Sequence, residues 1–251
     1  MKIALIGYGK MGRAIENAAL SRDHEIVARI NEGASDEELA MLDLADVAIE
    51  FTAPHAAVGN IELCFGKNIP VVVGTTGWYE AYPELKERCL SEGLSLLTAT
   101  NFSIGVNIFF EVNKRLAELM KDYSNYDVTM EEVHHTQKLD APSGTAISLA
   151  TQILERLKWK KSWKGVDDEE ELNEVSDTTL PILAKRIDEV PGTHSISYTS
   201  AIDTIEIKHT AHSRAGFAFG AVLAAEWLHG KKGVFTMENV IKNQEQVNEQ
   251  N

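Results

Sequence analysis

Short apolar runs alternate with amphipathic segments over the first hundred residues. Five runs have the length and composition of buried strands: residues 2–6, 25–30, 45–51, 69–74 and 94–97. Between them lie segments whose apolar residues share one helical face, as Met11, Ile15 and Ala18 do after the first run. Strands that alternate with helices form a parallel sheet covered on both faces, so the sequence predicts an α/β domain.

The pattern changes after about residue 100. The elements predicted there are helices over 106–120, 146–157 and 217–228 and alternating strands over 126–131, 194–200 and 204–211. The last two strands flank Ala201–Asp203, a pattern typical of a β-hairpin. Residues 159–178 are polar and acidic, and we interpret them as an exposed connection. The second part of the chain is therefore predicted to be an α+β domain with a mixed sheet.

A glycine motif follows the first strand and precedes the first helix. It reads Gly7-Tyr8-Gly9-Lys10-Met11-Gly12. In such a loop the first glycine allows a tight turn and the second lets the backbone approach a pyrophosphate. The third lets helix and strand pack closely, while N–H groups at the helix start bind phosphate oxygens. The motif and its context predict a dinucleotide site and a Rossmann-type parallel sheet in the first domain.

The end of the second strand bears on cofactor choice, because an acidic residue there binds the ribose 2′-hydroxyl of NAD. Asn31 occupies the expected position, Glu32 comes one step later, and Arg29 comes one step too early to meet a 2′-phosphate. NADH and NADPH both stay open. Loops after the fourth and fifth strands are also predicted to approach the cofactor: Gly74, Thr75 and Thr76, and Ala99, Thr100, Asn101 and Phe102.

Titratable residues gather in the stretch E-E-V-H-H-T-Q-K-L-D-A-P-S-G-T-A of residues 131–146. Ser143 is a candidate N-cap, with Gly144 and Thr145 in the first helical turn, where N–H groups have no intrahelical acceptor. His135 and Lys138 bring positive charge to the same place. The segment therefore predicts a site for a small anion, most simply a carboxylate.

The overall charge narrows the choice of partner. Lys and Arg number 24 against 38 Asp and Glu, which gives a net charge of −14 and argues against nucleic acid or an anionic membrane. No apolar run reaches the roughly 18 residues of a membrane span, and the N-terminal run is too short for a signal peptide. Cys64 and Cys89 lie far apart in helix-like segments, so we expect reduced thiols, no metal site and a cytoplasmic protein.

The stretch from Glu132 to Ala146 resembles the E-x-H-H-x-x-K-x-D-A-P-S-G-T-A motif of the 4-hydroxy-tetrahydrodipicolinate reductase family, also called dihydrodipicolinate reductases. Supporting matches occur in family order and cover residues 1 to about 230: the glycine loop and residues 51–54, 74–77 and 99–107. The chain departs from the family pattern at Lys10, where Arg is common, and at Asn31, where an acid is usual.

The resemblance implies reduction of hydroxy-tetrahydrodipicolinate to tetrahydrodipicolinate in lysine and diaminopimelate biosynthesis. NADH or NADPH would supply hydride, His134 the proton, and Lys138 a second catalytic cation. The residues implied to bind the dicarboxylate are His135, Lys138, Ser143, Gly144 and Thr145. The implied dinucleotide-binding domain is 1–102 with 214–251. Residues 103–213 would bind substrate and build a homotetramer. For Arg214 we favour a structural role over a second anion anchor.

Two other functions are compatible with parts of the sequence. One is another nicotinamide enzyme that acts on an imine or an aldehyde. An acylating semialdehyde dehydrogenase needs a cysteine nucleophile, and neither Cys64 nor Cys89 lies in a loop at a strand end. The other is a nucleotide-sensing regulator without turnover. The presence of His134 and Lys138 argues against it.

Overall fold

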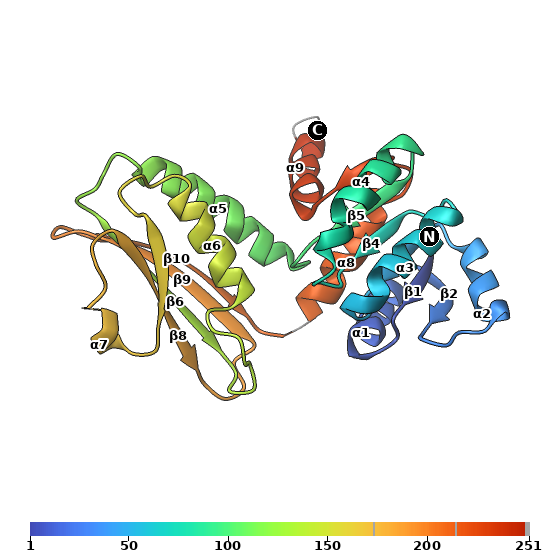
Figure 1. Ribbon diagram of the computed structural model, residues 1–251, viewed down its shortest axis with the longest axis horizontal. Helices are drawn as coiled ribbons and strands as arrows, with labels where there is room; N and C mark the ends of the chain where they lie inside the picture. Colours follow the sequence, from blue (N-terminus) through green and yellow to red (C-terminus); the bar gives the residue numbers. More distant parts are fainter. Residues whose placement is uncertain (173, 214, 249–251) are drawn as a thin grey trace. The chain divides into compact units, whose positions relative to one another are not determined.

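The structure is a computed structural model that describes residues 1–172, 174–213 and 215–248. The chain forms two compact units, Met1–Asn107 with Ala215–Asn251 and Ile108–Arg214. Figure 1 shows the helices and strands of both, with labels on most of them. Among the described helices, none has the length and apolarity that crossing a membrane would need.

The first unit is built on a parallel sheet with strand order β11-β5-β4-β3-β1-β2. Its strands are β1 (Lys2–Ile6), β2 (Glu25–Ile30), β3 (Val47–Glu50), β4 (Val71–Val73), β5 (Ser95–Thr98) and β11 (Gly233–Phe235). The five predicted strands and their parallel arrangement are confirmed. Strand β11 was not predicted, because three residues next to Lys and Gly carry too little apolar pattern to indicate a strand.

Helices cover both faces of this sheet, as Figure 1 shows. On one face lie α1 (Lys10–Leu20), α8 (Ala215–Leu228) and the start of α9 (Met237–Asn248). On the other lie α3 (Pro54–Gly66) and α4 (Tyr82–Ser91), with the short α2 (Asp36–Ala40) beside β2. Single 3₁₀ turns, Met41–Leu44 and Tyr79–Ala81, complete the connections.

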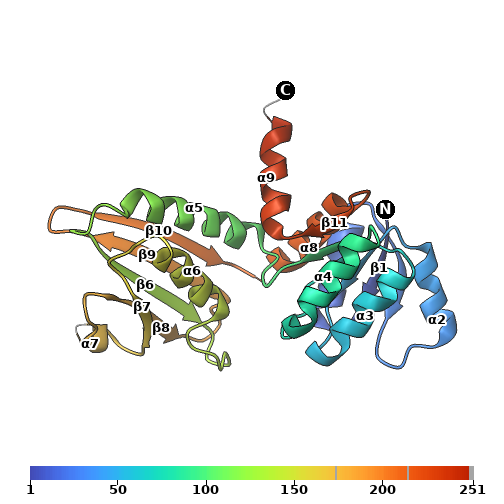
Figure 2. The same cartoon turned by 45° about the horizontal axis from the view of Figure 1, so that its top comes forward.

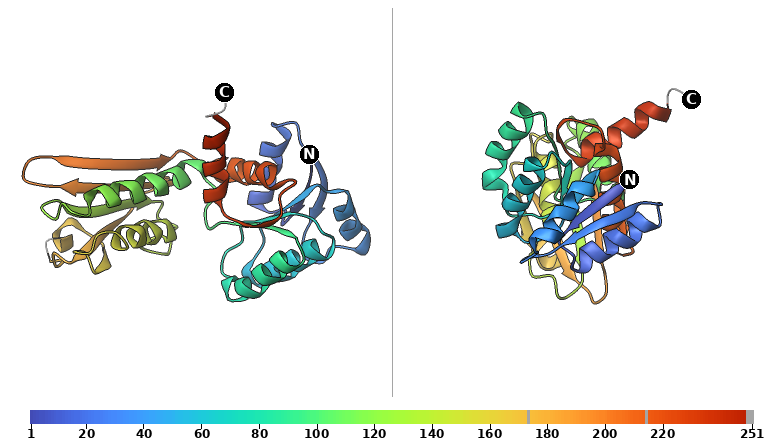
Figure 3. Two further views of the ribbon diagram at one scale, coloured as in Figure 1. Left: turned by 90° about the horizontal axis from the view of Figure 1, so that it is seen from above. Right: turned by 90° about the vertical axis from the view of Figure 1, so that its right-hand side faces the viewer.

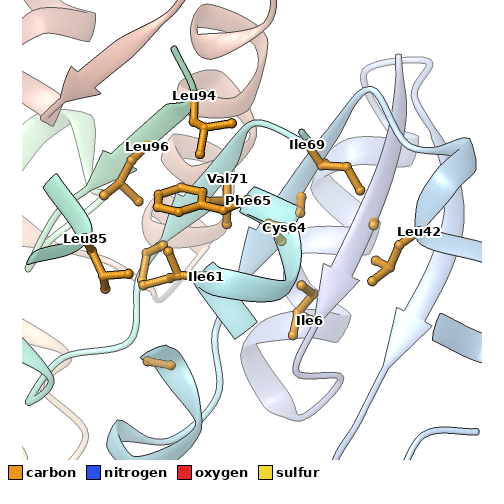
Figure 4. Packing of buried hydrophobic residues seen from close by; sticks show 14 of the residues in the cluster. Ile6, Leu42, Ile61, Cys64, Phe65, Ile69, Val71, Leu85, Leu94 and Leu96 are labelled. Atoms are coloured by element: carbon orange, nitrogen blue, oxygen red, sulfur yellow. The ribbon is translucent and has the colours of Figure 1, made fainter. Parts of the chain in front are cut away.

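The core between α3, α4 and the sheet is shown in Figure 4. Ile61 and Phe65 of α3 belong to the same buried cluster as Val71 and Leu96 of the central strands. Cys64 lies in this cluster, and its burial raises the pKa of the thiol to about 12. Cys64 and Cys89 are both buried free thiols, as predicted.

The opposite core depends on one close backbone contact. A Cβ atom on Gly220 of α8 would lie 1.7 Å from the carbonyl oxygen of Phe102, so only glycine lets the helix pack at this distance. The Phe102 ring is itself buried in the cluster under α8. The loop after β5 is thus fixed by the core as well as by its own hydrogen bonds.

The second unit is a mixed sheet with strand order β10-β9-β6-β8-β7, in which the pairs β6–β8 and β7–β8 are parallel. Its strands are β6 (Asp127–His134), β7 (Ser162–Val166), β8 (Thr179–Arg186), β9 (Gly192–Thr199) and β10 (Thr204–Ala211). Two helices, α5 (Ile104–Met120) and α6 (Gly144–Leu154), contribute to the core on one face of this sheet, and the β9–β10 hairpin runs beside α5 (Figures 2 and 3). The predicted mixed sheet and hairpin are confirmed.

The interpretation of residues 159–178 as an exposed connection was wrong. The segment contains β7, which pairs with β8, and the helix α7 (Glu169–Leu172). Lys160 is 3% exposed, because its stem is covered while its ammonium bonds the Thr179 carbonyl and Asp127. Gly165 packs against the Pro142 ring, so β7 supports the loop that precedes α6. Strand β7 is short and has charged residues on both sides, so the sequence pattern did not indicate a strand there.

Candidate active site

A cavity of about 650 Å³ lies at the carboxyl ends of β1, β2 and β3 in the first unit. The glycine loop forms one wall, and α3 forms another. Gly7 has φ +92°, and a Cβ on it would lie 2.0 Å from the Phe51 carbonyl oxygen. A Cβ on Gly12 would lie 2.2 Å from the Gly7 carbonyl oxygen, so both positions require glycine.

Part of the predicted cofactor set surrounds this cavity. The predicted residues in its lining are Gly7, Tyr8, Gly9 and Asn31. The Tyr8 backbone N–H donates to Asn31 Oδ1 at 2.9 Å, so the end of β2 holds the glycine loop in place. Lys10, Met11 and Gly12 begin α1 and do not line the cavity.

The other two predicted loops follow β4 and β5, strands of the same sheet whose carboxyl ends share its ligand-binding edge. Neither contributes to the lining of the cavity. After β4, Gly74 packs on the Phe51 ring and Thr75 Oγ1 accepts the Thr52 N–H at 2.7 Å, while Thr76 is exposed. The second loop runs from Ala99 to Phe102. Ala99 packs on the core and the Phe102 ring is buried in it. Between them, Thr100 is exposed and Asn101 Oδ1 accepts the Ser103 N–H.

Several lining residues that the sequence did not single out come from the β3–α3 segment, among them Thr52, His55 and Asn60. The Thr52 hydroxyl and the Asn60 amide both donate to Glu50, a carboxylate buried at the end of β3. The F-T-A-P match at 51–54 was a usable signal, because it follows a strand at the ligand-binding edge of the sheet.

In the second unit, a polar cluster surrounds the fully buried carboxylate of Glu132. The Ser143 backbone N–H donates to both of its oxygens, at 3.0 and 3.1 Å. His134 Nδ1 and His194 Nε2 each lie 3.6 Å from Oε2, and their rings meet edge to face at 5.1 Å. Strand β6 places Glu132 and His134 on one face because side chains two apart in a strand point the same way.

Arg186, at the end of β8, ties this cluster to the loop that follows β6. Its Nη2 donates to Glu132 Oε1 at 3.2 Å and to the Asp140 carbonyl at 2.6 Å, and its Nε donates to the Lys138 carbonyl at 3.2 Å. The Arg186 guanidinium therefore binds two backbone carbonyls of this loop and also the buried Glu132 carboxylate.

The buried groups have shifted protonation equilibria. Burial by itself would raise the pKa of Glu132, but the polar contacts of His194 and Ser143 outweigh it and lower that pKa to about 2. Burial lowers the pKa of His134 to about 4, although the charge of Glu132 opposes the shift. At neutral pH Glu132 is thus ionised and His134 neutral. An imidazole ordinarily titrates near neutral pH, and burial moves the pKa of His134 well below that range.

Lys138 and the predicted helix start lie on the same loop. Lys138 Nζ donates to both Asp140 oxygens, at 2.7 and 2.8 Å, which lowers the pKa of that carboxyl. Asp140 thus holds the Lys138 ammonium in an ion pair. His135 is half-buried, and its Nδ1 is buried with no hydrogen-bond partner in the described part of the chain.

The N-cap of α6 is Ser143, as predicted, and its Oγ accepts the Ala146 N–H at 3.2 Å. This oxygen also lies 3.2 Å from His194 Nε2, so the hydroxyl is committed to the fold. Gly144 is exposed and Thr145 half-buried, and their N–H groups lie in the first turn.

Two residues of this cluster were missed in the sequence. Arg186 and His194 lie 54 and 62 positions after Glu132, and only the pairing of β6 with β8 and β9 brings them together. Arg214 lies outside the described residues. Glu132, His134 and His194 offer three donor atoms within 4.8 Å, but Arg186 and Ser143 already bond the carboxylate. The two imidazoles lie 3.6 Å from the carboxylate, beyond hydrogen-bonding distance, so we interpret the triad as an electrostatic cluster around Glu132.

A glycine loop over a cavity in a Rossmann-type sheet, joined in one chain to a histidine and lysine cluster in an α+β unit, defines a nicotinamide-dependent oxidoreductase. The family models for the N-terminus and the C-terminus of dihydrodipicolinate reductase match residues 1–102 and 105–241. The chain belongs to the dihydrodipicolinate reductase family.

Relatives and solved structures agree with this assignment. A 4-hydroxy-tetrahydrodipicolinate reductase from Christiangramia forsetii is 49% identical over 97% of this chain and 98% of the relative. A dipicolinate-bound dihydrodipicolinate reductase from Paenisporosarcina sp. TG-14 has a TM-score of 0.75 and 27% identity, covering 95% of this chain and 98% of its own. An engineered D-amino acid dehydrogenase bound to NADP⁺ shares the fold, with a TM-score of 0.51, 16% identity and coverage of 94% and 92%. The family favours a reductase over both alternatives considered above.

The lowered pKa of His134 predicts a pH-dependent stability. Between its folded pKa of about 4 and its ordinary 6.5, the unfolded chain binds a proton that the folded chain does not, so the free energy of unfolding falls as pH falls through that window. From pH 7 to pH 5 this group should account for about 2 kcal/mol. Urea unfolding at the two pH values should show a smaller loss in His134→Gln than in the wild type.

The exposed histidine His229 provides the matched control, and His229→Gln should keep the wild-type difference between pH 7 and pH 5. Equal pH dependence in His134→Gln and the wild type would contradict the assignment of a neutral, buried imidazole.

Proposed function

We propose that this protein reduces 4-hydroxy-tetrahydrodipicolinate to tetrahydrodipicolinate in diaminopimelate and lysine biosynthesis. The observation that carries the proposal is the Glu132-centred cluster, which places His134 and the Lys138 loop beside the first turn of α6 in a chain of net charge −14. An acidic chain that gathers donors and cations at one place is suited to a doubly negative substrate. The similar Paenisporosarcina reductase holds dipicolinate, a cyclic dicarboxylate.

Within this proposal, one face of the α6 start binds carboxylate. The N–H groups of Gly144 and Thr145 have no intrahelical acceptor, and the helix start favours negative charge. Lys138 and His135 supply the cationic and hydrogen-bonding side chains, and Asp140 holds the Lys138 ammonium. A substrate carboxylate would compete with Asp140 for that ammonium.

His134 is proposed to deliver the proton. Its imidazole is neutral in this structure because burial lowers the pKa to about 4. A bound dicarboxylate brings negative charge, which raises the pKa of a nearby imidazole and lets it gain a proton before transfer. General acid assistance of this kind contributes roughly 10²–10⁴-fold. Lys138 would stabilise the charge that develops when hydride arrives.

The first unit is proposed to bind the cofactor, with residues 1–102 and 214–251 as the dinucleotide-binding domain and 103–213 as the substrate-binding domain. The cavity fits this role, because the close backbone approaches at Gly7 and Gly12 leave no room for a side chain and the start of α1 supplies N–H donors. NADH or NADPH supplies the hydride. Gly74 to Thr76 and Ala99 to Phe102 would approach it from the neighbouring strand ends.

Substitution of Lys138 tests the catalytic part of the proposal. Lys138→Ala should lower kcat by about 10²-fold or more while the Kd for NADH stays within twofold, because Lys138 lies outside the nucleotide cavity. The assay follows the loss of nicotinamide absorbance with freshly generated hydroxy-tetrahydrodipicolinate.

Lys158→Ala, at an exposed position in the same unit, is the matched control and should leave turnover unchanged. The proposed reaction would be contradicted if the wild-type protein binds NADH but does not oxidise it with this substrate. Equal loss of turnover and NADH affinity in Lys138→Ala would instead assign the lysine a structural role.

We also propose that the enzyme is a cytoplasmic homotetramer. The five-stranded sheet of the second unit has α5 and α6 on one face, while the other face carries a shallow hollow lined by residues such as Thr129, Ser195 and Ser197. Such a face is suited to a second copy of the sheet. Light scattering after gel filtration should give the mass of four chains, and the mass of one chain at micromolar concentration would contradict the assembly.

A further inference from the structure

We propose that this reductase prefers NADH to NADPH, and that Glu32 is the residue that sets the preference. The inference rests on the proposed function, because it assumes that a nicotinamide dinucleotide occupies the cavity of the first unit. It goes beyond that function by naming which of the two cofactors the cavity accepts.

Glu32 lies where the adenosine ribose of a dinucleotide binds in such sheets, just beyond the end of β2. It is exposed, and it lines the cavity together with Asn31 and Gly33. A carboxylate at this place can accept hydrogen bonds from the ribose hydroxyls of NADH. The same carboxylate repels the 2′-phosphate of NADPH.

Asn31 does not replace the missing acid. Its Oδ1 accepts the backbone N–H of Tyr8 at 2.9 Å, so it holds the glycine loop. Its side chain is also neutral and offers no charge that could favour or reject a phosphate. The strand pattern predicts an acidic residue at position 31. In the structure, the carboxylate that lines the cavity belongs to Glu32 instead.

Arg29, the residue considered as a partner for a 2′-phosphate, points away from the cavity. Neighbouring residues of β2 face opposite sides of the sheet, and Ile30 lines the cavity while Arg29 meets Glu16 of α1. Arg29 Nε donates to Glu16 Oε1 at 3.1 Å, and the Tyr8 hydroxyl bonds the same carboxylate. The Arg29 charge is thus committed to a buried carboxylate.

The rest of the cavity has few groups that could bind the 2′-phosphate of NADPH. Its lining, which falls wholly within described residues, contains neither lysine nor arginine. Arg13 of α1 lies 5.8 Å from the centroid of the Tyr8 ring and outside the lining. A 2′-phosphate carries a charge of about −1.5 to −2 and would face Glu32 with neither lysine nor arginine among the lining residues.

Equilibrium binding tests this inference without turnover. The Kd values of NADH and NADPH, measured by nicotinamide fluorescence on the full chain at one fixed ionic strength, should differ by about tenfold or more in favour of NADH. Glu32→Arg should abolish or invert that ratio, because it removes the repulsion and supplies a phosphate ligand. Glu32→Gln should reduce the ratio less, since it keeps hydrogen-bonding capacity for the ribose.

Glu25→Arg makes the same change of charge at the opposite end of β2, at an exposed position, and should leave the ratio at the wild-type value. Equal affinity for both cofactors, tighter binding of NADPH, or an unchanged ratio in Glu32→Arg would overturn the preference while leaving the reductase function intact. Failure of both dinucleotides to bind would overturn the proposed function and this inference together.

Discussion

The buried carboxylate of Glu132 is the interaction on which the candidate active site depends. It is fully covered by protein and ionised, with a pKa lowered to about 2. A buried charge is tolerated only when its partners satisfy it, and in this protein the partners come from β8, β9 and the start of α6. The same bonds fix the loop that carries Lys138. The electrostatic requirement of one carboxylate thereby positions the groups proposed to bind substrate.

This arrangement also explains how an acidic protein can bind an acidic molecule. The chain carries a net charge of −14, which repels anions at long range. Around Glu132, however, Arg186 and Lys138 lie close together with two imidazoles, and the free N–H groups of α6 add to them. Short-range donors of this kind outweigh a diffuse field that salt screens beyond about 8–10 Å. The cavity of the first unit has neither lysine nor arginine among its lining residues, so the proposed dinucleotide would be held there chiefly by backbone N–H groups at the start of α1.

Local pattern predicted those features that depend on local chemistry. The parallel strands, the glycine loop and the Ser143 cap all follow from residues within a few positions of one another. The strand β7 could not be predicted, because its stability comes from pairing with β8 and its five residues, Ser-Trp-Lys-Gly-Val, have no clear apolar pattern. The roles of Arg186 and His194 could not be predicted for the same reason, because only the order of the strands brings them to Glu132. The neutral state of His134 also required the structure, since burial and not sequence sets it.

The most direct test of this account is the neutral, nearly isosteric substitution Glu132→Gln, assayed by the pH profile of kcat/KM together with the Kd for NADH. If Glu132 positions the site, kcat/KM should fall by about 10²-fold and its acidic limb should shift, because the charge that acts on His134 is lost. The Kd for NADH should stay within twofold, which shows that the first unit is intact. A variant with wild-type kcat/KM and an unshifted profile would contradict the central role of the buried carboxylate.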